Sequence, residues 1–308
     1  PSWSPDGQEL AIGYLDNRIR LLKTSSWQSI SIASEYSYDW ILDISWAPNG
    51  NLFASSSTDG SVRIWDGDTG NCIKTIIYDP YIFSREIDWS SDGSNIAILY
   101  DNEVSILETE NWESHHTLTG HTNSISSIAW SPNGNYIASS SYAGIWPDVQ
   151  GEIKIWNGIS YDCVETLVIP TDEINSLKWS PDSNYLASAS EDGTVTIWDT
   201  NTWMCEKTLT SDLDCAHTIS WSQDGNILSS AGYCEDSGYD QYIFFWDTSS
   251  WDCIQTLNAH NLHIKTLDWS ADNTRLASGS EGYSVLIWSQ DSDGDRYVDN
   301  VDAFPNDP

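Results

Sequence analysis

Residues 120–140 read GHTNSISSIAWSPNGNYIASS, and residues 153–156 read IKIW. Apolar and small residues alternate up to Trp130, and Pro132 and Gly134 then stand at the second and fourth positions of a tight turn. The runs on either side of the turn carry the β-branched and aromatic residues that strands favour. With a further run at residues 163–167, this stretch predicts a four-stranded antiparallel meander.

Six other segments repeat this plan at a period of about forty residues, and such a period indicates a repeat architecture. The tryptophan that ends the first strand recurs as Trp3, Trp46, Trp89, Trp130, Trp179, Trp221 and Trp269. Third strands end in Trp65, Trp156, Trp198, Trp246 and Trp288, with Leu22 and Leu107 in the other two copies. The combination of Trp-Ser-Pro-Asp-Gly with Ile-Trp-Asp-Thr resembles the WD-repeat β-propeller family. The resemblance implies an all-β, seven-bladed β-propeller of four-stranded antiparallel blades over residues 1–290.

The ends of this repeat region depart from the plan. The first copy begins at Pro1 with almost none of its first strand, and the seventh runs over residues 264–288 with no fourth strand recognised before an acidic tail. We therefore expect the terminal blade to be incomplete and residues 291–308 to form a separate segment. The second strands are rich in Ala and Ser, which either suits a crowded site near the propeller axis or is merely tolerated there.

The chain is strongly acidic, with 46 acidic against 12 basic residues and a formal net charge of −34. This charge repels a phosphate backbone, and no stripe of basic residues with interleaved aromatics offsets it, so nucleic acid is excluded as the expected partner. The acidic surface either keeps the protein soluble or attracts cations. No membrane-inserting segment is visible in the sequence.

Six cysteines fall into two groups on the repeat. Four stand at the start of fourth strands, in separate blades, and are expected to be free, packed thiols: Cys72, Cys163, Cys205 and Cys253. Cys215 and Cys234 lie on the first and second strands of the sixth copy, opposite each other or one residue apart. They form either a disulfide, as an oxidising compartment would favour, or two unpaired thiols.

The acidic tail predicts a calcium site. Carboxylates at loop positions 1, 3, 5, 9 and 12, with a backbone carbonyl at position 7, can wrap one hard cation. The predicted ligands are Asp291, Asp293, Asp295, Tyr297, Asp299 and Asp302. Arg296 replaces the glycine of an EF-hand loop, and with residues 303–308 the segment is similar to thrombospondin type 3 calcium repeats. That resemblance implies an extracellular or cell-surface protein. A flexible acidic linker without calcium, and a cytoplasmic location, are the alternatives.

Motifs for catalysis are absent: the sequence has no Gly-x-Ser-x-Gly elbow, phosphate loop or His-Glu-x-x-His. His260 and His263 have the spacing of a metal pair, but the WD-repeat resemblance assigns His260 and His121 to a structural network with Asp, Ser and Trp. Neither blade carries the Asp of that network beside its His, so we do not expect the full network. The regular aspartates Asp16, Asp59, Asp101, Asp192 and Asp240 match the Asp position and are read as structural.

Aromatic residues gather in the connections between blades and between second and third strands, which emerge on one face. They are Tyr36, Tyr38, Trp40, Tyr78, Tyr81, Phe83, Tyr142, Trp146, Tyr233, Tyr239 and Tyr242. Exposed Tyr and Trp suit recognition surfaces, although these side chains could instead brace long loops. The leading hypothesis is a non-enzymatic scaffold that binds proteins or surface and matrix ligands there. The alternatives are a hydrolase or lyase with a site at the central channel, or a structural spacer.

Overall fold

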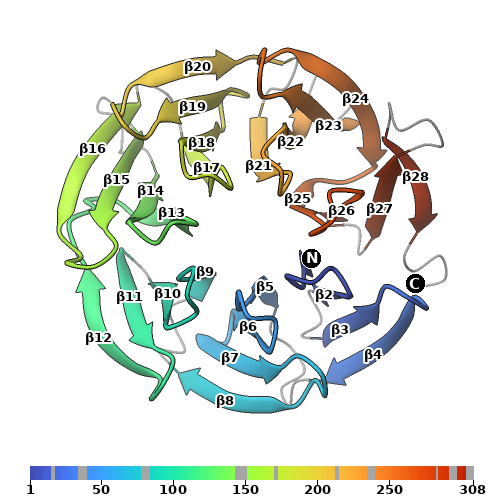
Figure 1. The fold of residues 1–308 in the computed structure, drawn as a ribbon, viewed down its shortest axis with the longest axis horizontal. Coiled ribbons are helices and arrows are strands. Elements are labelled where there is room, and N and C mark those ends of the chain that lie inside the picture. The colour runs from blue at the N-terminus through green and yellow to red at the C-terminus, as the bar shows by residue number, and fades with distance from the viewer. Residues whose placement is uncertain are drawn as a thin grey trace. The chain divides into compact units, whose positions relative to one another are not determined.

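The structure is a computed structural model. It describes residues 1–14, 18–33, 40–77, 84–100, 102–142, 151–169, 173–211, 215–234, 240–281, 284–290 and 297–302. Every regular element within these ranges is a β-strand. The strands form seven sheets of four strands each, which Figure 1 shows in chain order. The fold is all-β, with the seven antiparallel blades of a β-propeller, and this confirms the predicted fold class.

The chain divides into two compact units, which we call the N-terminal unit (Ser2–Ser141 and Lys154–Thr166) and the C-terminal unit (Pro1, Tyr142–Ile153 and Leu167–Pro308). Blades 1 to 3 lie in the N-terminal unit: β1 (Ser2–Trp3), β2 (Glu9–Gly13), β3 (Arg18–Lys23), β4 (Gln28–Ala33); β5 (Ile41–Trp46), β6 (Leu52–Ser57), β7 (Ser61–Asp66), β8 (Cys72–Ile77); β9 (Ser84–Trp89), β10 (Asn95–Tyr100), β11 (Glu103–Glu108), β12 (Glu113–Leu118). Blade 4, most of which belongs to the same unit, is β13 (Ile125–Trp130), β14 (Tyr136–Ser141), β15 (Gly151–Asn157) and β16 (Cys163–Ile169).

Blades 5 to 7 lie in the C-terminal unit. They are β17 (Ile174–Trp179), β18 (Tyr185–Ser190), β19 (Val195–Asp199), β20 (Cys205–Leu209); β21 (Cys215–Trp221), β22 (Ile227–Cys234), β23 (Asp240–Asp247), β24 (Cys253–His260); β25 (Ile264–Trp269), β26 (Arg275–Ser280), β27 (Val285–Gln290) and β28 (Tyr297–Asp302). Within each unit the core lies between consecutive blades. Ile64 of blade 2 and Ile96 of blade 3 are fully buried in one such layer, and Phe245 of blade 6 packs on Trp269 of blade 7 in another.

Third-strand tryptophans explain the small residues of the second strands. In five blades the indole Nε1–H donates to a buried serine hydroxyl on the second strand at 2.8–3.0 Å. The pairs are Trp65 with Ser55, Trp156 with Ser139, Trp198 with Ser188, Trp246 with Ser230, and Trp288 with Ser278. A buried N–H needs an acceptor, and serine supplies one without filling the space that the indole occupies.

The two histidines that the WD-repeat resemblance assigns to a structural network, His121 and His260, lie beside serines of these Trp–Ser pairs. His260 Nε2 lies 2.7 Å from Ser278 Oγ, and its Nδ1 lies 3.0 Å from Ser284 Oγ. His121 Nε2 lies 2.7 Å from Ser139 Oγ in blade 4. His260 thus lies within hydrogen-bond distance of two serine hydroxyls of blade 7, as expected of a structural residue.

Acidic side chains cap the free edges of first strands. Asp43 Oδ2 accepts from the backbone N–H of Ile87 at 3.0 Å, and Asp88 Oδ2 accepts from that of Trp130 at 2.7 Å. First strands are sheet edges, whose backbone donors need partners when they are buried. Part of the acidic composition is thus structural.

An aromatic residue occupies the left-handed region in the turn before several fourth strands. Trp203 (φ 56°) and Trp251 (φ 60°) pack edge-on against Trp179 and Trp221, each at 6.1 Å between ring centroids. A positive φ is unfavourable for a bulky side chain, and the ring contacts offset that strain. The same conformation is found at Trp27, Trp112 and Tyr161.

The prediction of an incomplete terminal blade was wrong. Tyr297–Asp302 forms β28 and pairs with β27, for example Ile287 with Val301, so blade 7 has four strands. The physical reason is that fourth strands face solvent, as the exposed β8 and β20 show, so an acidic sequence can complete the ladder through its backbone. The first blade keeps only the two-residue strand β1, as expected.

The four fourth-strand cysteines are free, as predicted, but they are exposed and not packed. Each begins a solvent-facing strand, and its sulfur lies 3.6–3.8 Å from the hydroxyl of the threonine three residues later. Sequence reasoning placed them correctly on the repeat but assumed an inward orientation for the side chain.

Candidate functional site

Three positions recur in the blades at the end where the chain enters the first strand and leaves the second. They lie six and four residues before the first-strand tryptophan, and five residues after the second-strand residue paired with that tryptophan. In the C-terminal unit we call these nine residues the loop-end cluster: Glu173, Asn175 and Glu191 of blade 5, Cys215, His217 and Tyr233 of blade 6, and His263, Lys265 and Glu281 of blade 7.

A β-bulge at the second of these positions aims the side chains. The ladder of β17 with β18 skips Asn175, that of β21 with β22 skips His217, and that of β25 with β26 skips Lys265. A bulge leaves one residue outside the regular pairing and re-aims its side chain. Three consecutive blades therefore present polar side chains at equivalent points.

Glu191 is the centre of the first part of the cluster. Its Oε2 accepts hydrogen bonds from Asn175 Nδ2 at 2.8 Å and from the Cys215 thiol at 3.0 Å. Asn175 also donates to the backbone carbonyl of Ala216 at 3.1 Å, and Cys215 is 1% exposed. These bonds join the loop ends of blades 5 and 6.

Three rings form the second part. Tyr233 and His263 stack with their centroids 4.9 Å apart and 3° between their planes. The His217 ring lies 5.7 Å from Tyr233 and 5.8 Å from His263. The arrangement gives blades 6 and 7 a partly exposed aromatic surface.

An ion pair borders these rings. Lys265 Nζ lies 3.1 Å from Glu281 Oε1, and His263 Nδ1 lies 3.9 Å from the other carboxylate oxygen. Both Lys265 and Glu281 are exposed, and such a pair contributes little to stability. Its carboxylate and ammonium groups are instead accessible to a partner.

Burial and neighbouring charges set the protonation of the cluster. Burial opposes the charge of Glu191, but the Cys215 and Asn175 hydrogen bonds outweigh it and lower the pKa of the carboxyl. Burial and the Glu191 hydrogen bond raise the pKa of the Cys215 thiol. Burial, followed by the Lys265 charge, lowers the pKa of His217 to about 4. At neutral pH the cluster thus holds a carboxylate, a protonated thiol and a neutral imidazole.

One group in the cluster has the composition of a metal site. The ligand atoms of Glu191, Cys215 and His217 all lie within 4.8 Å of one another. Carboxylate oxygen, thiolate sulfur and imidazole nitrogen are the ligands that zinc takes in proteins. The other polar residues of the cluster surround this group without completing it.

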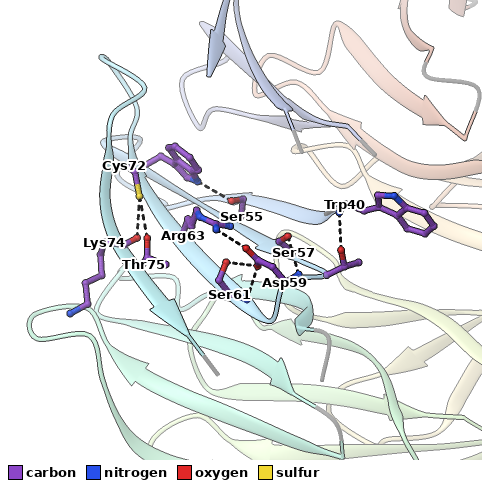
Figure 2. Close-up of polar contacts among 11 residues, drawn as sticks. Trp40, Ser55, Ser57, Asp59, Ser61, Arg63, Cys72, Lys74 and Thr75 are labelled. Carbon is purple, nitrogen blue, oxygen red and sulfur yellow. Dashed lines mark hydrogen bonds and ion pairs between the residues drawn. The ribbon is translucent and has the colours of Figure 1, made fainter. Parts of the chain in front are cut away.

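Two of the same three positions in blade 2 of the N-terminal unit are apolar, and the third is Thr58. Trp40 is 52% exposed and Leu42, the bulge residue of β5, is 38% exposed. The backbone N–H of Trp40 donates to Thr58 Oγ1 at 2.8 Å, and the N–H of Thr58 donates to the Trp40 carbonyl at 3.0 Å. Figure 2 shows Trp40 projecting away from the strands. The tryptophan backbone is fixed while its ring remains accessible.

A buried ion pair supports the turn next to Trp40 (Figure 2). Asp59 Oδ2 lies 2.6 Å from Arg63 Nη2, and Asp59 also accepts from the backbone and hydroxyl of Ser61. Burial opposes the charge of Asp59, but the Arg63 and Ser61 hydrogen bonds outweigh it and lower the pKa of the carboxyl. In blade 5, the Asp192 carboxylate accepts from the backbone and hydroxyl of Thr194, and its backbone N–H donates to Ser190 Oγ, all within one turn. Both aspartates are structural, as expected.

Four of the predicted aromatic residues lie in the described part of the chain. Trp40 is exposed, Tyr233 stacks on His263, Tyr142 is half-buried, and Tyr242 packs against the core between blades 5 and 6. Tyr242 therefore braces its blade. The others lie outside the described residues: Tyr36, Tyr38, Tyr78, Tyr81, Phe83, Trp146 and Tyr239.

Sequence reasoning missed most of the loop-end cluster, because it searched for residues that break the repeat. A signal was present: four residues before the first-strand tryptophan stand Leu42, Arg85, Ser126, Asn175, His217 and Lys265. This position varies in charge and size from blade to blade, whereas the residue before it is Ile, Ala or Ser in these six copies. Only the bulge gives that variation a spatial meaning.

Of the two cysteines of the possible disulfide, the structure describes the side chain of Cys215. Cys215 is a free, buried thiol, and the ladder pairs it with Tyr233. The side chain of Cys234 lies outside the described residues. Of the predicted calcium ligands, Asp291, Asp293 and Asp295 lie outside the described residues, and those from Tyr297 to Asp302 are described only as the backbone of β28.

Comparison with known proteins agrees with this architecture. Four segments match the family described as WD domain, G-beta repeat: residues 30–66, 112–157, 161–199 and 251–289. Together they cover more than half of the 308 residues. The chain belongs to this family. WD-repeat propellers are typically non-enzymatic scaffolds that bind proteins.

Two relatives are similar over short stretches. Protein HIRA of Dictyostelium discoideum is 33% identical over 70 residues, which are 19% of this chain and 6% of the relative. Transcriptional corepressor LEUNIG_HOMOLOG of Arabidopsis thaliana is 33% identical over 73 residues, which are 23% of this chain and 8% of the relative. The matches thus span less than a tenth of either relative. Among the described residues, no helix is long and apolar enough to cross a bilayer.

Proposed function

We propose that this WD-repeat chain is a non-enzymatic scaffold that binds a protein segment at the loop ends of its blades. The observation that carries the proposal is Trp40, which is 52% exposed while its backbone is held by two hydrogen bonds to Thr58. A tryptophan fixed in this way loses little conformational freedom on binding, and such residues dominate interface energies. Leu42 beside it extends the apolar surface.

The charge of the chain favours a basic partner. A formal net charge of −34 attracts basic segments and raises their association rate. An aromatic and aliphatic anchor at Trp40 and Leu42 would then receive an apolar side chain of that segment. The expected partner is therefore a basic protein segment with at least one large apolar residue.

Catalysis through the loop-end cluster is the second candidate, and the electrostatics disfavour it. Reactive cysteines are found where the thiolate is stabilised. At Cys215, burial and the Glu191 hydrogen bond raise the pKa of the thiol. The thiol donates its proton to the carboxylate, so it is poorly suited to act as a nucleophile.

The scaffold proposal is tested by selecting, from a displayed peptide library, those peptides that bind to the chain. We expect the selected peptides to be basic and to bind more weakly as the salt concentration rises. Their affinity should fall at least about tenfold for the Trp40→Ala variant, which is the loss expected when a hot-spot residue is removed. Ile77→Ala is the matched control, because Ile77 is 71% exposed on the outer strand β8. Equal affinity for Trp40→Ala and the unchanged chain would overturn the proposal. Failure to select any peptide would favour a structural spacer.

The calcium site in residues 291–302 and an extracellular location are also proposals. They rest on the carboxylate spacing alone, with β28 providing the backbone of the second half of that segment. Calcium calorimetry tests the site directly.

A further inference from the structure

We propose that Glu191, Cys215 and His217 bind a zinc ion at the loop ends of blades 5 and 6. The three ligand atoms lie within 4.8 Å of one another, and Cys215 Sγ is 3.0 Å from Glu191 Oε2. Zinc bonds are about 2.0–2.3 Å long, so small side-chain rotations would bring the three ligand atoms to the separations that one shared zinc ion requires. The inference is independent of the peptide-binding proposal.

The donor set favours zinc over other common ions. Calcium and magnesium take oxygen ligands, which a thiol and an imidazole do not supply. One sulfur, one nitrogen and one oxygen suit zinc in tetrahedral geometry, with the fourth position left for water or for a partner's side chain. A thiolate and a carboxylate together neutralise the two charges of the ion.

Neighbouring residues hold the ligands as metal sites require. Asn175 donates to Glu191 Oε2 at 2.8 Å and to the Ala216 carbonyl at 3.1 Å, so it fixes the carboxylate against the strand that carries the cysteine and histidine. The His217 ring is confined by Tyr233 and His263. Partners of this kind typically change metal affinity by about 10–100-fold when removed.

Binding would replace the hydrogen bond between Cys215 and Glu191 by three bonds from zinc to Glu191, Cys215 and His217, while zinc releases the waters that these ligands displace. The Cys215 thiol gives up the proton that it shares with Glu191, a Zn–S bond forms, and the proton leaves to the buffer. No oxidation state changes. About one proton is therefore released per ion, and calorimetry in buffers of different ionisation enthalpy measures it.

Zinc titration against a chromophoric chelator, on the full chain, tests the site. We expect one zinc per chain, with Cys215→Ser and His217→Gln each weakening binding at least about tenfold and Asn175→Ala by about tenfold. Cys205→Ser is the matched control, since Cys205 is an exposed thiol in the same unit. Unchanged affinity in Cys215→Ser and His217→Gln would overturn the proposal.

Two further readouts do not depend on the stability of the variants. Cobalt added to the unchanged chain should give a sulfur-to-metal charge-transfer band, because cobalt occupies zinc sites and bonds the thiolate. Zinc should also raise the melting temperature in proportion to the logarithm of its concentration. A chain that shows neither the band nor the shift has no such site, and the proposal fails.

Discussion

Replacing Ser278 with alanine should destabilise the chain more than the same change in a neighbouring blade. Ser278 is fully buried, accepts from Trp288 Nε1 at 2.8 Å, and lies 2.7 Å from His260 Nε2. Ser188, at the same position of blade 5, accepts from Trp198 at 3.0 Å but has no histidine among its described contacts. The two substitutions remove the same atom, and they differ in that Ser278 also contacts a histidine ring at 2.7 Å, whereas the second contact of Ser188 is a longer one to the Thr196 carbonyl at 3.4 Å.

The expected difference follows from the price of an unsatisfied buried group, about 1–3 kcal/mol each. Ser188→Ala removes the acceptor of the Trp198 indole N–H and a long hydrogen bond to the Thr196 carbonyl at 3.4 Å, and should cost about 1–2 kcal/mol. Ser278→Ala removes a hydrogen-bond partner from both the Trp288 N–H and the His260 Nε2, so we expect about 2–4 kcal/mol. At roughly 2 °C per kcal/mol for a chain of this size, the melting temperatures should fall by about 2–4 °C and about 4–8 °C.

Differential scanning fluorimetry, with circular dichroism to check the fold, measures both shifts under one scan rate. Adding Trp288→Phe removes the donor as well as the acceptor, so Ser278→Ala should cost about 1–2 kcal/mol less in that background. Equal shifts for Ser278→Ala and Ser188→Ala would refute the reasoning, because the histidine bond would then contribute nothing.

Two further predictions concern titration and calcium. The pKa of His217 is lowered to about 4, against 6.5 for the free side chain, so the unfolded chain binds a proton more readily than the folded chain. The free energy of unfolding should therefore fall by about 2 kcal/mol as the pH falls from 7 to 5. In chelator-treated samples, His217→Gln should lose that much less stability over the same range in urea unfolding, and identical pH dependence would contradict the assignment. The calcium proposal predicts one site by calorimetry that the Asp291→Ala/Asp293→Ala/Asp295→Ala variant lacks, and an unchanged chain that binds no calcium would exclude it.

The repeat was predictable because its signals are local. Each first-strand tryptophan, turn and third-strand tryptophan lies within one blade, and the pairing of Trp130 with Ile137 or Trp179 with Leu186 follows from the turn between them. The fourth strand of blade 7 was missed for the opposite reason. Residues 297–302 carry no apolar pattern, and their strand exists through backbone pairing with β27.

The roles of single side chains were less predictable. The expected cluster of exposed aromatics includes Trp40, which is exposed, and Tyr242, which is packed into the core. Both are aromatic residues near loop ends, and nothing local distinguishes them. Whether a ring faces solvent depends on what the neighbouring blade places against it, which is a matter of tertiary packing.

By itself, the sequence determined the number of blades, their strand order and the sevenfold recurrence of the tryptophans, because hydrophobic alternation and turn chemistry act over short distances. Only the tertiary structure decided which polar residues meet. Glu191 and Cys215 stand 24 positions apart on different blades, yet their side chains are hydrogen-bonded at 3.0 Å. That contact needs the packing of one blade against the next, which no single stretch of residues specifies.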